Sequence, residues 1–331
     1  MRLLIKVFSL IFLLVCAIVG GILWWASQPL TLRSSPLDFR VVAGSSFRSA
    51  ISQMQAAGVR VEPMLLASLA RIKRAENTIK AGSYSISRGI TPLQLLEKLT
   101  QGQVTMGQLT FVEGWTFKQW RLRLDSHSDL RHETQDLGEA QIIERLGLPV
   151  ESLDGWLFSD TYLFDKHSSD LELLARAGRS MQLKLDSEWA GRDEGLPYKT
   201  AHEALVMASI VEKETGRDAD RALVAAVFVN RLRRGMLLQT DPTVIYGVGD
   251  DFDGNLRKRD LQFDTPYNTY IRSGLPPTPI AMPGLASLRA ALHPATSDVL
   301  YFVARGDGSS EFSRTLDEHN RAVNKYQRGG K

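Results

Sequence analysis

The chain has 331 residues, and 44% of them are hydrophobic, which is enough to bury a sizeable core and excludes an intrinsically disordered protein. The formal net charge is only +3, and no basic stripe interleaved with aromatic residues stands out, so nucleic acid is excluded as an expected partner. The single cysteine excludes an intramolecular disulfide and a cysteine-based metal site. The composition therefore predicts globular modules that are stabilised by packing.

The first predicted element is a transmembrane helix over residues 7–27. This stretch is uncharged, and about 20 apolar residues are enough to cross a bilayer as a helix. Arg2 and Lys6 precede it, and positive charge ahead of a span predicts a cytoplasmic N-terminus with the rest of the chain on the outer side. A cleaved signal peptide is the alternative, but Trp24 and Trp25 stand where cleavage requires small residues. We therefore expect one uncleaved anchor, preceded by a short cytoplasmic segment, residues 1–6.

A small α+β module is expected over residues 38–108, after a linker at residues 28–37 that contains proline and serine. Its pattern predicts two strands and three helices: a strand at 39–42, a helix after Ser46 through Ala57, a helix at 62–74, a strand at 81–86 and a helix at 91–99. Thr91 and Pro92 are typical of the start of a helix, and Gly102 is expected to close the module.

The composition changes at Leu109, and residues 109–327 are expected to form a larger, mixed α/β domain. Two apolar-periodic helices are predicted at 204–215 and 222–234, followed by a strand near 299–303. The segment 154–162 combines aromatic and acidic residues in a turn-rich stretch. It could line a sugar groove, or it could form a buried aromatic corner between two lobes.

The helix at 204–215 brings two carboxylates to the end of an apolar element. Spacings of three and four residues place Glu214 on a face with Met207 and Ile210, whereas Glu212 lies on a neighbouring face. A glutamate set against apolar side chains loses hydration, and this raises its pKa towards the value that a general acid needs near neutral pH. The alternative is an ordinary amphipathic helix whose last turn is solvated.

Three loops downstream, at residues 239–247, 266–270 and 273–280, are dense in amide, hydroxyl and rigid turn residues. Such groups offer hydrogen bonds together with flat apolar surface, which suits a polyhydroxylated ligand. The sequence has no glycine-rich phosphate loop, no histidines at metal-ligand spacing and no Gly-x-Ser-x-Gly motif. We therefore expect no cofactor and no metal, and a carboxylate acid beside a sugar-binding groove.

Taken together and in this order, several motifs resemble those of the membrane-anchored endolytic murein transglycosylases, the YceG-like group. The motifs are at residues 208–215, 229–232, 238–247, 267–270 and 274–280, and the resemblance covers nearly the whole chain. It implies an α+β fold with an N-terminal transmembrane helix, a small LysM-like subdomain and a larger catalytic domain that cuts glycan strands internally. It also implies a single-pass protein of the bacterial inner membrane with a periplasmic or extracytoplasmic catalytic domain.

The resemblance implies a catalytic glutamate within residues 212–215. We place it at Glu214, because the Glu214–Thr215 pair is similar to the Glu-Ser pair of other lytic transglycosylases; Glu212 is the second choice. The residues expected to hold the sugars are Asn230, Gln239, Thr240, Asp241, Tyr246, Tyr267 and Asn268. Their alternative role is to cap turns and to pair with buried backbone groups. Asp241, before Pro242, is expected to form a turn rather than to act as a second acid.

The expected reaction needs one carboxyl group. Glu214 protonates the β-1,4 glycosidic oxygen between N-acetylmuramic acid and N-acetylglucosamine, and the muramic acid's own 6-hydroxyl then closes a 1,6-anhydro ring. Two alternatives stay open. A muramidase that uses water needs a second carboxylate, for which Asp241, Asp160 and Glu212 are the candidates. A non-catalytic, glycan-binding scaffold of the cell-wall synthesis machinery needs no acid at Glu214.

The expected partners follow from the same resemblance. They are the glycan strands of peptidoglycan, the membrane through one anchor and, as a family-level expectation, glycan-polymerising synthases whose nascent strands the enzyme would terminate or trim. The LysM-like subdomain is expected to help hold glycan, or alternatively to act as a spacer.

Overall fold

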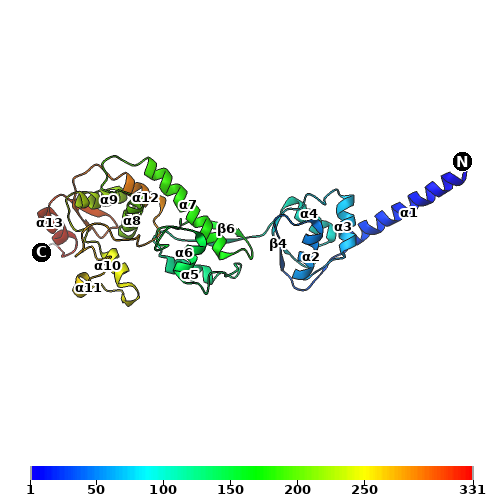
Figure 1. The fold of residues 1–331 in the computed structure, drawn as a ribbon, viewed down its shortest axis with the longest axis horizontal. Helices are drawn as coiled ribbons and strands as arrows, with labels where there is room; N and C mark the ends of the chain where they lie inside the picture. The colour runs from blue at the N-terminus through cyan, green and yellow to red at the C-terminus, as the bar shows by residue number, and fades with distance from the viewer. Residues whose placement is uncertain (1, 330–331) are drawn as a thin grey trace. The chain divides into compact units, whose positions relative to one another are not determined.

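The computed structural model describes residues 2–329, which form helices connected by short strands (Figure 1). In chain order the elements are α1 (Arg2–Ala26), β1 (Thr31–Leu32), β2 (Leu37–Val41), α2 (Phe47–Ala57), β3 (Val59–Arg60), α3 (Pro63–Ile72), β4 (Gly82–Ile86), α4 (Pro92–Gln101), β5 (Met106–Thr110), α5 (Phe117–Asp125), α6 (Glu139–Leu146), β6 (Thr161–Asp165), α7 (Asp170–Ala190), α8 (Ala201–Glu214), α9 (Asp218–Arg233), α10 (Asp241–Val248), the 3-10 helix η1 (Gly249–Asp251), α11 (Lys258–Gln262), α12 (Leu285–Leu292), β7 (Tyr301–Ala304), β8 (Ser310–Ser313) and α13 (Leu316–Tyr326). The predicted mixed α+β fold with an apolar N-terminal helix is confirmed.

The chain divides into two compact units. The smaller unit contains the residues up to Gln108 together with Asp129–Arg131 and Leu163–Ser168, and the larger unit contains the rest. The sequence did not predict that the two short segments belong to the smaller unit. Lys166 shows one reason, because its Nζ lies 3.1 Å from a carboxylate oxygen of Asp38 and 3.4 Å from one of Asp129.

In the smaller unit, β2 and β4 pair antiparallel, with Leu37 opposite Ile86 and Val41 opposite Gly82. The alternating burial along β2 turns Leu37, Phe39 and Val41 into the core. The predicted helices and strands of this module are all present. Their caps explain the bounds: the Ser46 and Thr91 side chains accept backbone N–H groups at the starts of α2 and α4, and left-handed glycines end both helices.

Residues 28–37 are more than a linker. Thr31 and Leu32 form β1, which pairs antiparallel with Arg60 and Val59 of β3. Leu37 is only 2% exposed, and Leu30 and Leu32 pack against the same core. Apolar side chains between the prolines and serines therefore draw this segment into the module. The LysM-like identity of the module stays a prediction.

The N-terminal helix α1 contains one stretch, Leu4–Ala26, that is long and apolar enough to cross a membrane. Its last turn is built into the smaller unit: Ala26 is 1% exposed, and Ile22 and Trp25 pack against the unit's core. Helices α3 and α4 both contact α1. The helix therefore runs directly into the folded module.

The larger unit is organised around α8. Helices α7, α9, α10 and α12 all contact it, and every residue from Ala204 to Val211 is at most 1% exposed. The helix is therefore buried all round and is not the amphipathic helix of the alternative interpretation. The face bearing Glu212 is as deeply buried as the face bearing Glu214, so apolar neighbours alone do not distinguish the two carboxylates.

The segment 154–162 forms a buried corner. Asp154, Leu157, Phe158 and Tyr162 are all less than 9% exposed. The Tyr162 hydroxyl donates to the carbonyl of Phe158 at 2.6 Å, which ties the turn to itself. Of the two roles considered for this segment, the structure gives it the packing role.

Candidate active site

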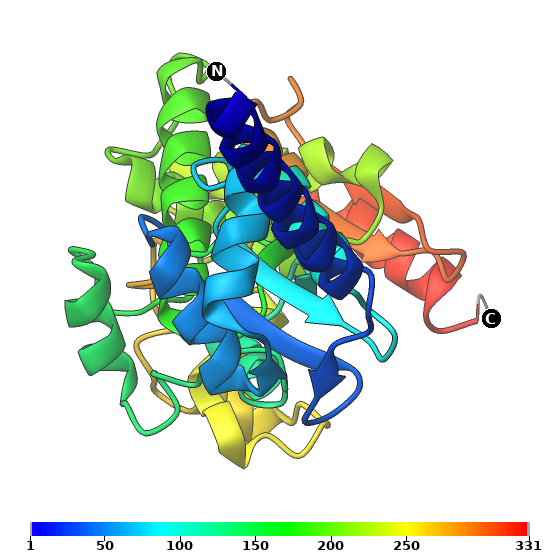
Figure 2. The ribbon, with the colours of Figure 1, turned by 90° about the vertical axis from the view of Figure 1, so that its right-hand side faces the viewer.

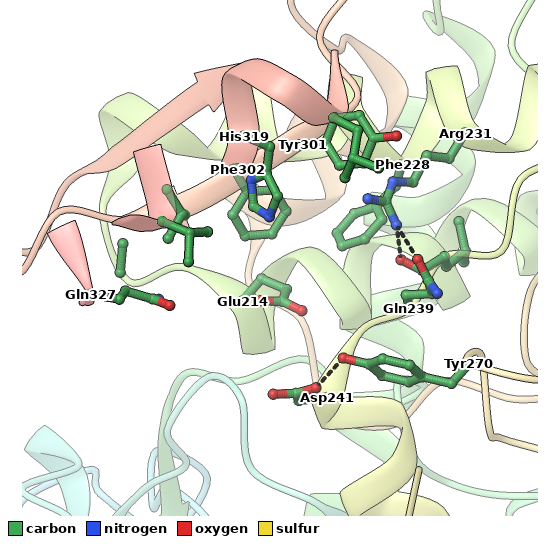
Figure 3. Close-up of a pocket in the computed structure, with 15 residues that line it drawn as sticks. Glu214, Phe228, Arg231, Gln239, Asp241, Tyr270, Tyr301, Phe302, His319 and Gln327 are labelled. Carbon is green, nitrogen blue, oxygen red and sulfur yellow. Dashed lines mark hydrogen bonds between the residues drawn. The ribbon is translucent and has the colours of Figure 1, made fainter. Parts of the chain in front are cut away.

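Glu214, the last residue of α8, lines a cavity of about 570 Å³ in the larger unit (Figure 3). The cavity is open to solvent and combines polar and aromatic side chains, as a site for a polyhydroxylated ligand requires. The residues lining it are Glu214, Phe228, Arg231, Leu238, Gln239, Asp241, Tyr270, Tyr301, Phe302, Val303, Ala304, Leu316, His319, Val323 and Gln327.

The environment of Glu214 favours its neutral form. Burial raises the pKa of this carboxyl, and the nearby charge of Asp241 raises it further. A hydrogen bond from the Thr240 hydroxyl to Oε1 and the charge of Arg231 act in the opposite direction. Because the Thr240 bond occupies Oε1, Oε2 is the oxygen left to carry a proton. The site thus holds a carboxyl group that can donate a proton at a higher pH than an exposed glutamate.

Asp241 begins α10 beside Glu214, and its carboxylate is already engaged. The Tyr270 hydroxyl donates to Oδ1 at 2.5 Å (Figure 3). Burial and this carboxylate together raise the pKa of Tyr270, so the phenol stays protonated as a donor. Asp241 therefore lines the cavity with a carboxylate that is held by Tyr270. The loop predicted over residues 239–247 is helical from Asp241 onwards, so the turn expected at this residue is replaced by the start of α10.

Arg231 is a cation in the cavity wall that the sequence did not single out as a site residue. Its Nε donates to the Leu300 carbonyl at 2.7 Å, and its Nη1 donates to the Leu238 carbonyl at 2.9 Å. The guanidinium carbon lies 5.0 Å from the centre of the Tyr301 ring. Arg231 thereby joins α9 to the loop before Gln239 and to β7. A charged residue among the apolar residues of this helix was the sequence signal that could have identified it as a site residue.

The predicted sugar-binding residues separate into three groups. Gln239 and Asp241 line the cavity, and Thr240 contacts Glu214 directly. Gln239 has a φ of 51°, a left-handed conformation that is uncommon for a residue with a Cβ and that occurs at functional sites. These three consecutive residues are brought together with the catalytic candidate.

Asn230 and Asn268 pair with backbone groups instead. The Asn230 amide donates to the carbonyls of Ser297 and Val299 at 2.8 and 3.0 Å. Asn268 is fully buried, donates to the Phe263 carbonyl at 2.7 Å and accepts from the Tyr270 N–H. Both follow the alternative role of pairing with buried backbone, and neither lines the cavity. Asn268 still acts on the site, because it holds the loop that carries Tyr270.

Tyr246 and Tyr267 form a packed pair outside the cavity lining. Their rings meet edge to face with 4.7 Å between centres. The Tyr267 hydroxyl lies 2.8 Å from the Thr278 hydroxyl, and the Tyr246 hydroxyl donates to Asp154 at 2.6 Å. These contacts connect the predicted polar loops to each other and to the buried corner at 154–162.

The carboxylate of Glu212 makes different contacts from that of Glu214. Its Oε2 accepts from the Gly284 N–H at 3.0 Å and from the Ser287 hydroxyl at 2.7 Å. These groups belong to the first turn of α12, where a carboxylate is favoured by the unpaired N–H groups and the helix dipole. Glu212 therefore caps α12, and it does not line the cavity with Glu214.

The far wall of the cavity comes from the C-terminal part of the chain. Tyr301 and Phe302 lie on β7, and His319 and Gln327 lie on or next to α13 (Figure 3). The His319 ring stacks on Tyr301 with 5.2 Å between centres, and burial together with the charge of Arg231 lowers its pKa. The sequence analysis did not predict these residues, because no motif marks them and only the fold brings α13 to the cavity that Glu214 lines.

The carboxyl group of Asp154, in the buried corner at residues 154–162, has a raised pKa. Burial raises its pKa to about 6, although the Tyr246 hydroxyl and the Phe117 N–H donate to its carboxylate. Burial disfavours the charged form of Asp154, so ionisation of this group lowers the free energy of unfolding. This loss of stability is absent below about pH 4 and complete above about pH 6, where it is on the order of 3 kcal/mol.

Asp154→Asn keeps an acceptor for the Phe117 N–H and offers a donor to the Tyr246 oxygen, but it removes the charge. We expect the variant to be more stable than the wild type above pH 6 and to lose this advantage as the pH falls towards 4. Thermal unfolding across this pH range measures the difference. An advantage independent of pH would contradict the raised pKa.

Within the described residues, Asp125, His132 and Asp170 form a group whose potential metal-ligand atoms lie within 4.8 Å of one another. The Asp170 carboxylate already accepts the N–H groups of Glu133, Thr134 and Leu171 and the Thr134 hydroxyl. With these four bonds its lone pairs are occupied, which explains its burial without a cation. The group does not line the cavity of Glu214.

Comparisons with known proteins agree with this architecture. Residues 39–325 match the YceG-like family. The endolytic murein transglycosylase of Bacillus subtilis strain 168 is 35% identical over 267 residues, covering 75% of this chain and 73% of that protein. The endolytic murein transglycosylase of Streptococcus pneumoniae D39 is 27% identical, covering 96% of this chain and 65% of that protein. The crystal structure of a yceG-like protein from Listeria monocytogenes superimposes with a TM-score of 0.54 at 29% identity, covering 87% of this chain and 99% of that one.

Proposed function

Because this chain belongs to the YceG-like family, we propose that it is an endolytic murein transglycosylase in which Glu214 is the catalytic acid. The observation that carries the proposal is a half-buried carboxyl group with a raised pKa at the wall of an open, polar and aromatic cavity. Its relatives named as endolytic murein transglycosylases are enzymes, and they match most of its length. A binding scaffold would not need this carboxyl group.

In the proposed reaction, Glu214 donates the proton on Oε2 to the glycosidic oxygen that leaves from C1 of N-acetylmuramic acid. The C1–O bond breaks, and positive charge develops on C1 and the ring oxygen. The carboxylate of Glu214 then takes the proton of the 6-hydroxyl as O6 bonds to C1. Because this hydroxyl is part of the same sugar, it attacks at high effective molarity and no water is activated.

The neighbouring groups have proposed roles in the same steps. Asp241, held by Tyr270, places a negative charge beside the developing positive charge. Thr240 keeps Oε1 of Glu214 in place by a hydrogen bond. Gln239, Tyr301 and His319 offer polar and flat surfaces to the sugars.

Hydrolysis with water is the second candidate, and Asp241 is the specific observation in its favour, since it is the other carboxylate lining the cavity. The other two candidates do not line the cavity: Glu212 caps α12, and Asp160 accepts a hydrogen bond from the N–H of its neighbour Thr161 at 2.7 Å.

The products of the two reactions differ, and this difference is the test. We expect mass spectrometry of digested peptidoglycan to find 1,6-anhydro-N-acetylmuramic acid ends within released internal fragments. Reducing ends would mean hydrolysis, and no fragments would favour a scaffold.

The pH dependence of cleavage tests the electrostatics around Glu214. The general acid must start protonated, so activity is lost as the pH rises through its raised pKa. Thr240→Val removes a hydrogen bond that favours the charged form and should move this alkaline limb to higher pH. Asp241→Asn removes a charge that favours the neutral form and should move the limb to lower pH. Shifts in the same direction, measured as kcat/KM against pH, would contradict the assignment.

The apolar helix α1 supports a further part of the proposal, a single-pass anchor in the bacterial inner membrane. With residues 1–6 on the cytoplasmic side, the rest of the chain is extracytoplasmic and meets peptidoglycan strands as they emerge. We propose that it terminates or trims nascent strands next to glycan-polymerising synthases, while the LysM-like module helps to hold glycan. Co-purification of the full chain with such a synthase tests the partnership.

A further inference from the structure

The smaller unit is strongly basic, although the whole chain is nearly balanced. Residues 28–108 contain ten lysines and arginines against four aspartates and glutamates, whereas residues 109–331 contain 28 against 33. The excess positive charge of the protein is therefore concentrated in the module into which α1 runs. A basic surface next to a membrane anchor attracts anionic lipid headgroups.

Helix α3 lies at the side of this module from which α1 leaves (Figure 1). The two helices are in contact, and Figure 2, which faces this side, shows α3 directly behind α1. The inner face of α3 places Leu66, Leu69 and Ala70 in the core, where each is fully buried. Its outer face therefore lies beside the point where α1 emerges.

That outer face combines exposed apolar and basic side chains. Met64 is 84% exposed and Ile72 is 41% exposed, and the helical spacing of eight residues places them on one stripe together with Arg71. Arg71 has a side chain that is 79% exposed and lies 3.2 Å from Glu76. Exposed apolar side chains bordered by arginine and lysine are typical of a helix that rests in the interface of a bilayer.

Basic residues continue past the end of α3. Arg74 has a φ of 55°, in the left-handed position after a helix where glycine is usual. Lys73 and Arg74 line a cavity of about 360 Å³ together with Thr78 and Thr100, whose hydroxyls donate to the backbone carbonyls of Ala75 and Glu97, and Glu97 is the acidic residue in this lining. Two cations suit the oxygens of a phosphate, and one carboxylate leaves the lining net positive.

We propose that the outer face of α3 docks on the bilayer, with Met64 and Ile72 at the headgroup and acyl boundary and with Arg71, Lys73 and Arg74 on the phosphates of anionic phospholipids. This inference rests on the proposed membrane span of α1 and not on the enzymatic reaction. Docking fixes the module against the membrane at two points, the end of α1 and the face of α3.

The test uses the full chain in nanodiscs of phosphatidylcholine, with or without phosphatidylglycerol. A bimane label on Met64→Cys, in a Cys16→Ser background, reports whether nitroxides on the lipid headgroups quench it. Val42→Cys is the matched control, because Val42 is an exposed apolar residue, 55% accessible, that follows β2. Strand β2 pairs with β4, which lies on the side of the module opposite α1 (Figure 1). We expect strong quenching at position 64 and weak quenching at position 42.

Charge variants test the anionic lipid. Lys73→Gln and Arg74→Gly should each lower the ratio of docked to undocked module by about fivefold in nanodiscs that contain phosphatidylglycerol. Added salt should reduce the difference, because it screens exposed charges. Arg74→Gly suits its left-handed backbone, so loss of docking cannot be attributed to loss of folding. Arg48→Gln on α2 is the charge-matched control and should leave quenching unchanged.

Native Cys16, the one cysteine, lies within α1 and tests the span separately. Bimane on Cys16 should be quenched by nitroxides in the acyl chains. Quenching at Cys16 with equal, weak quenching at positions 64 and 42 would overturn the docking proposal and leave the α3 face to a protein partner. A lack of quenching at Cys16 would overturn it together with the anchor, while the glycan products would still decide the enzymatic function.

Discussion

Glu214→Gln is expected to abolish glycan cleavage while the protein still folds. The glutamine keeps the size of the side chain and an acceptor for the Thr240 hydroxyl, but it has no proton to donate. Loss of a general acid costs about 10²- to 10⁴-fold in rate, and here the same group also serves as the base, so the upper end of this range is expected. Release of 1,6-anhydro fragments from purified peptidoglycan measures the loss.

Folding of Glu214→Gln should be intact, because its charged form is already disfavoured by burial. A melting temperature equal to or slightly above that of the wild type is expected, which separates loss of chemistry from loss of structure. Wild-type activity in this variant would refute the assignment and return attention to Glu212.

Glu212→Gln is the matched control, made two residues away on the same helix. Its amide oxygen can still accept from Gly284 and Ser287, so the cap of α12 remains, and the lost charge at the helix start costs about 0.3–1 kcal/mol. We expect cleavage close to the wild-type rate. If Glu212→Gln were inactive and Glu214→Gln active, the roles of the two carboxylates would be exchanged.

Arg231→Met is expected to lower the free energy of unfolding of the larger unit strongly. Arg231 is 8% exposed and donates to the carbonyls of Leu300, Leu238 and Leu237, so methionine leaves three acceptors without this donor. Unpaired buried groups and the loss of a buried, fully bonded cation together cost roughly 3–5 kcal/mol. In a unit of this size that corresponds to a fall in melting temperature of about 10 °C.

Arg233→Met is the control for this prediction. Arg233 lies two residues later on the same helix, is exposed, and donates to the Gly195 carbonyl at 2.9 Å. It carries the same charge, so a change in net charge is common to both variants. The control should shift the melting temperature by no more than about 1–2 °C. Equal shifts in the two variants would show that Arg231 does not organise the cavity wall.

The choice between the two glutamates shows where sequence reasoning and structure differ. Helical spacing assigned Glu214 an apolar face, and this is correct for Met207 and Ile210, which are fully buried. The same spacing gave Glu212 equally buried neighbours, since Ser209 and Leu205 are also fully buried. The two glutamates differ in what they contact at the end of α8. Glu212 accepts a hydrogen bond from the first turn of α12, whereas Glu214 lines the cavity.

The polar loops illustrate a second difference. An amide or a hydroxyl in a loop is a hydrogen-bonding group whether it faces a ligand or a backbone carbonyl, so composition alone could not separate Gln239 from Asn268. In the fold, Gln239 lines the cavity and Asn268 is fully buried among backbone groups. The C-terminal wall, with Tyr301 and His319, had no signal at all, because its contribution arises from packing between segments distant in the chain.

The features that depend on local patterns could be predicted from the amino-acid sequence. These are the apolar α1, the capped helices of the small module, the apolar α8 and the family motifs, because hydrophobic periodicity and capping act between residues a few positions apart. Which polar groups meet depends on how segments distant in the chain pack together. Arg231 of α9 and the residues Thr240 and Asp241 at the start of α10 lie beside Glu214, and burial together with these groups sets the direction of the pKa shift on which its proposed chemistry depends.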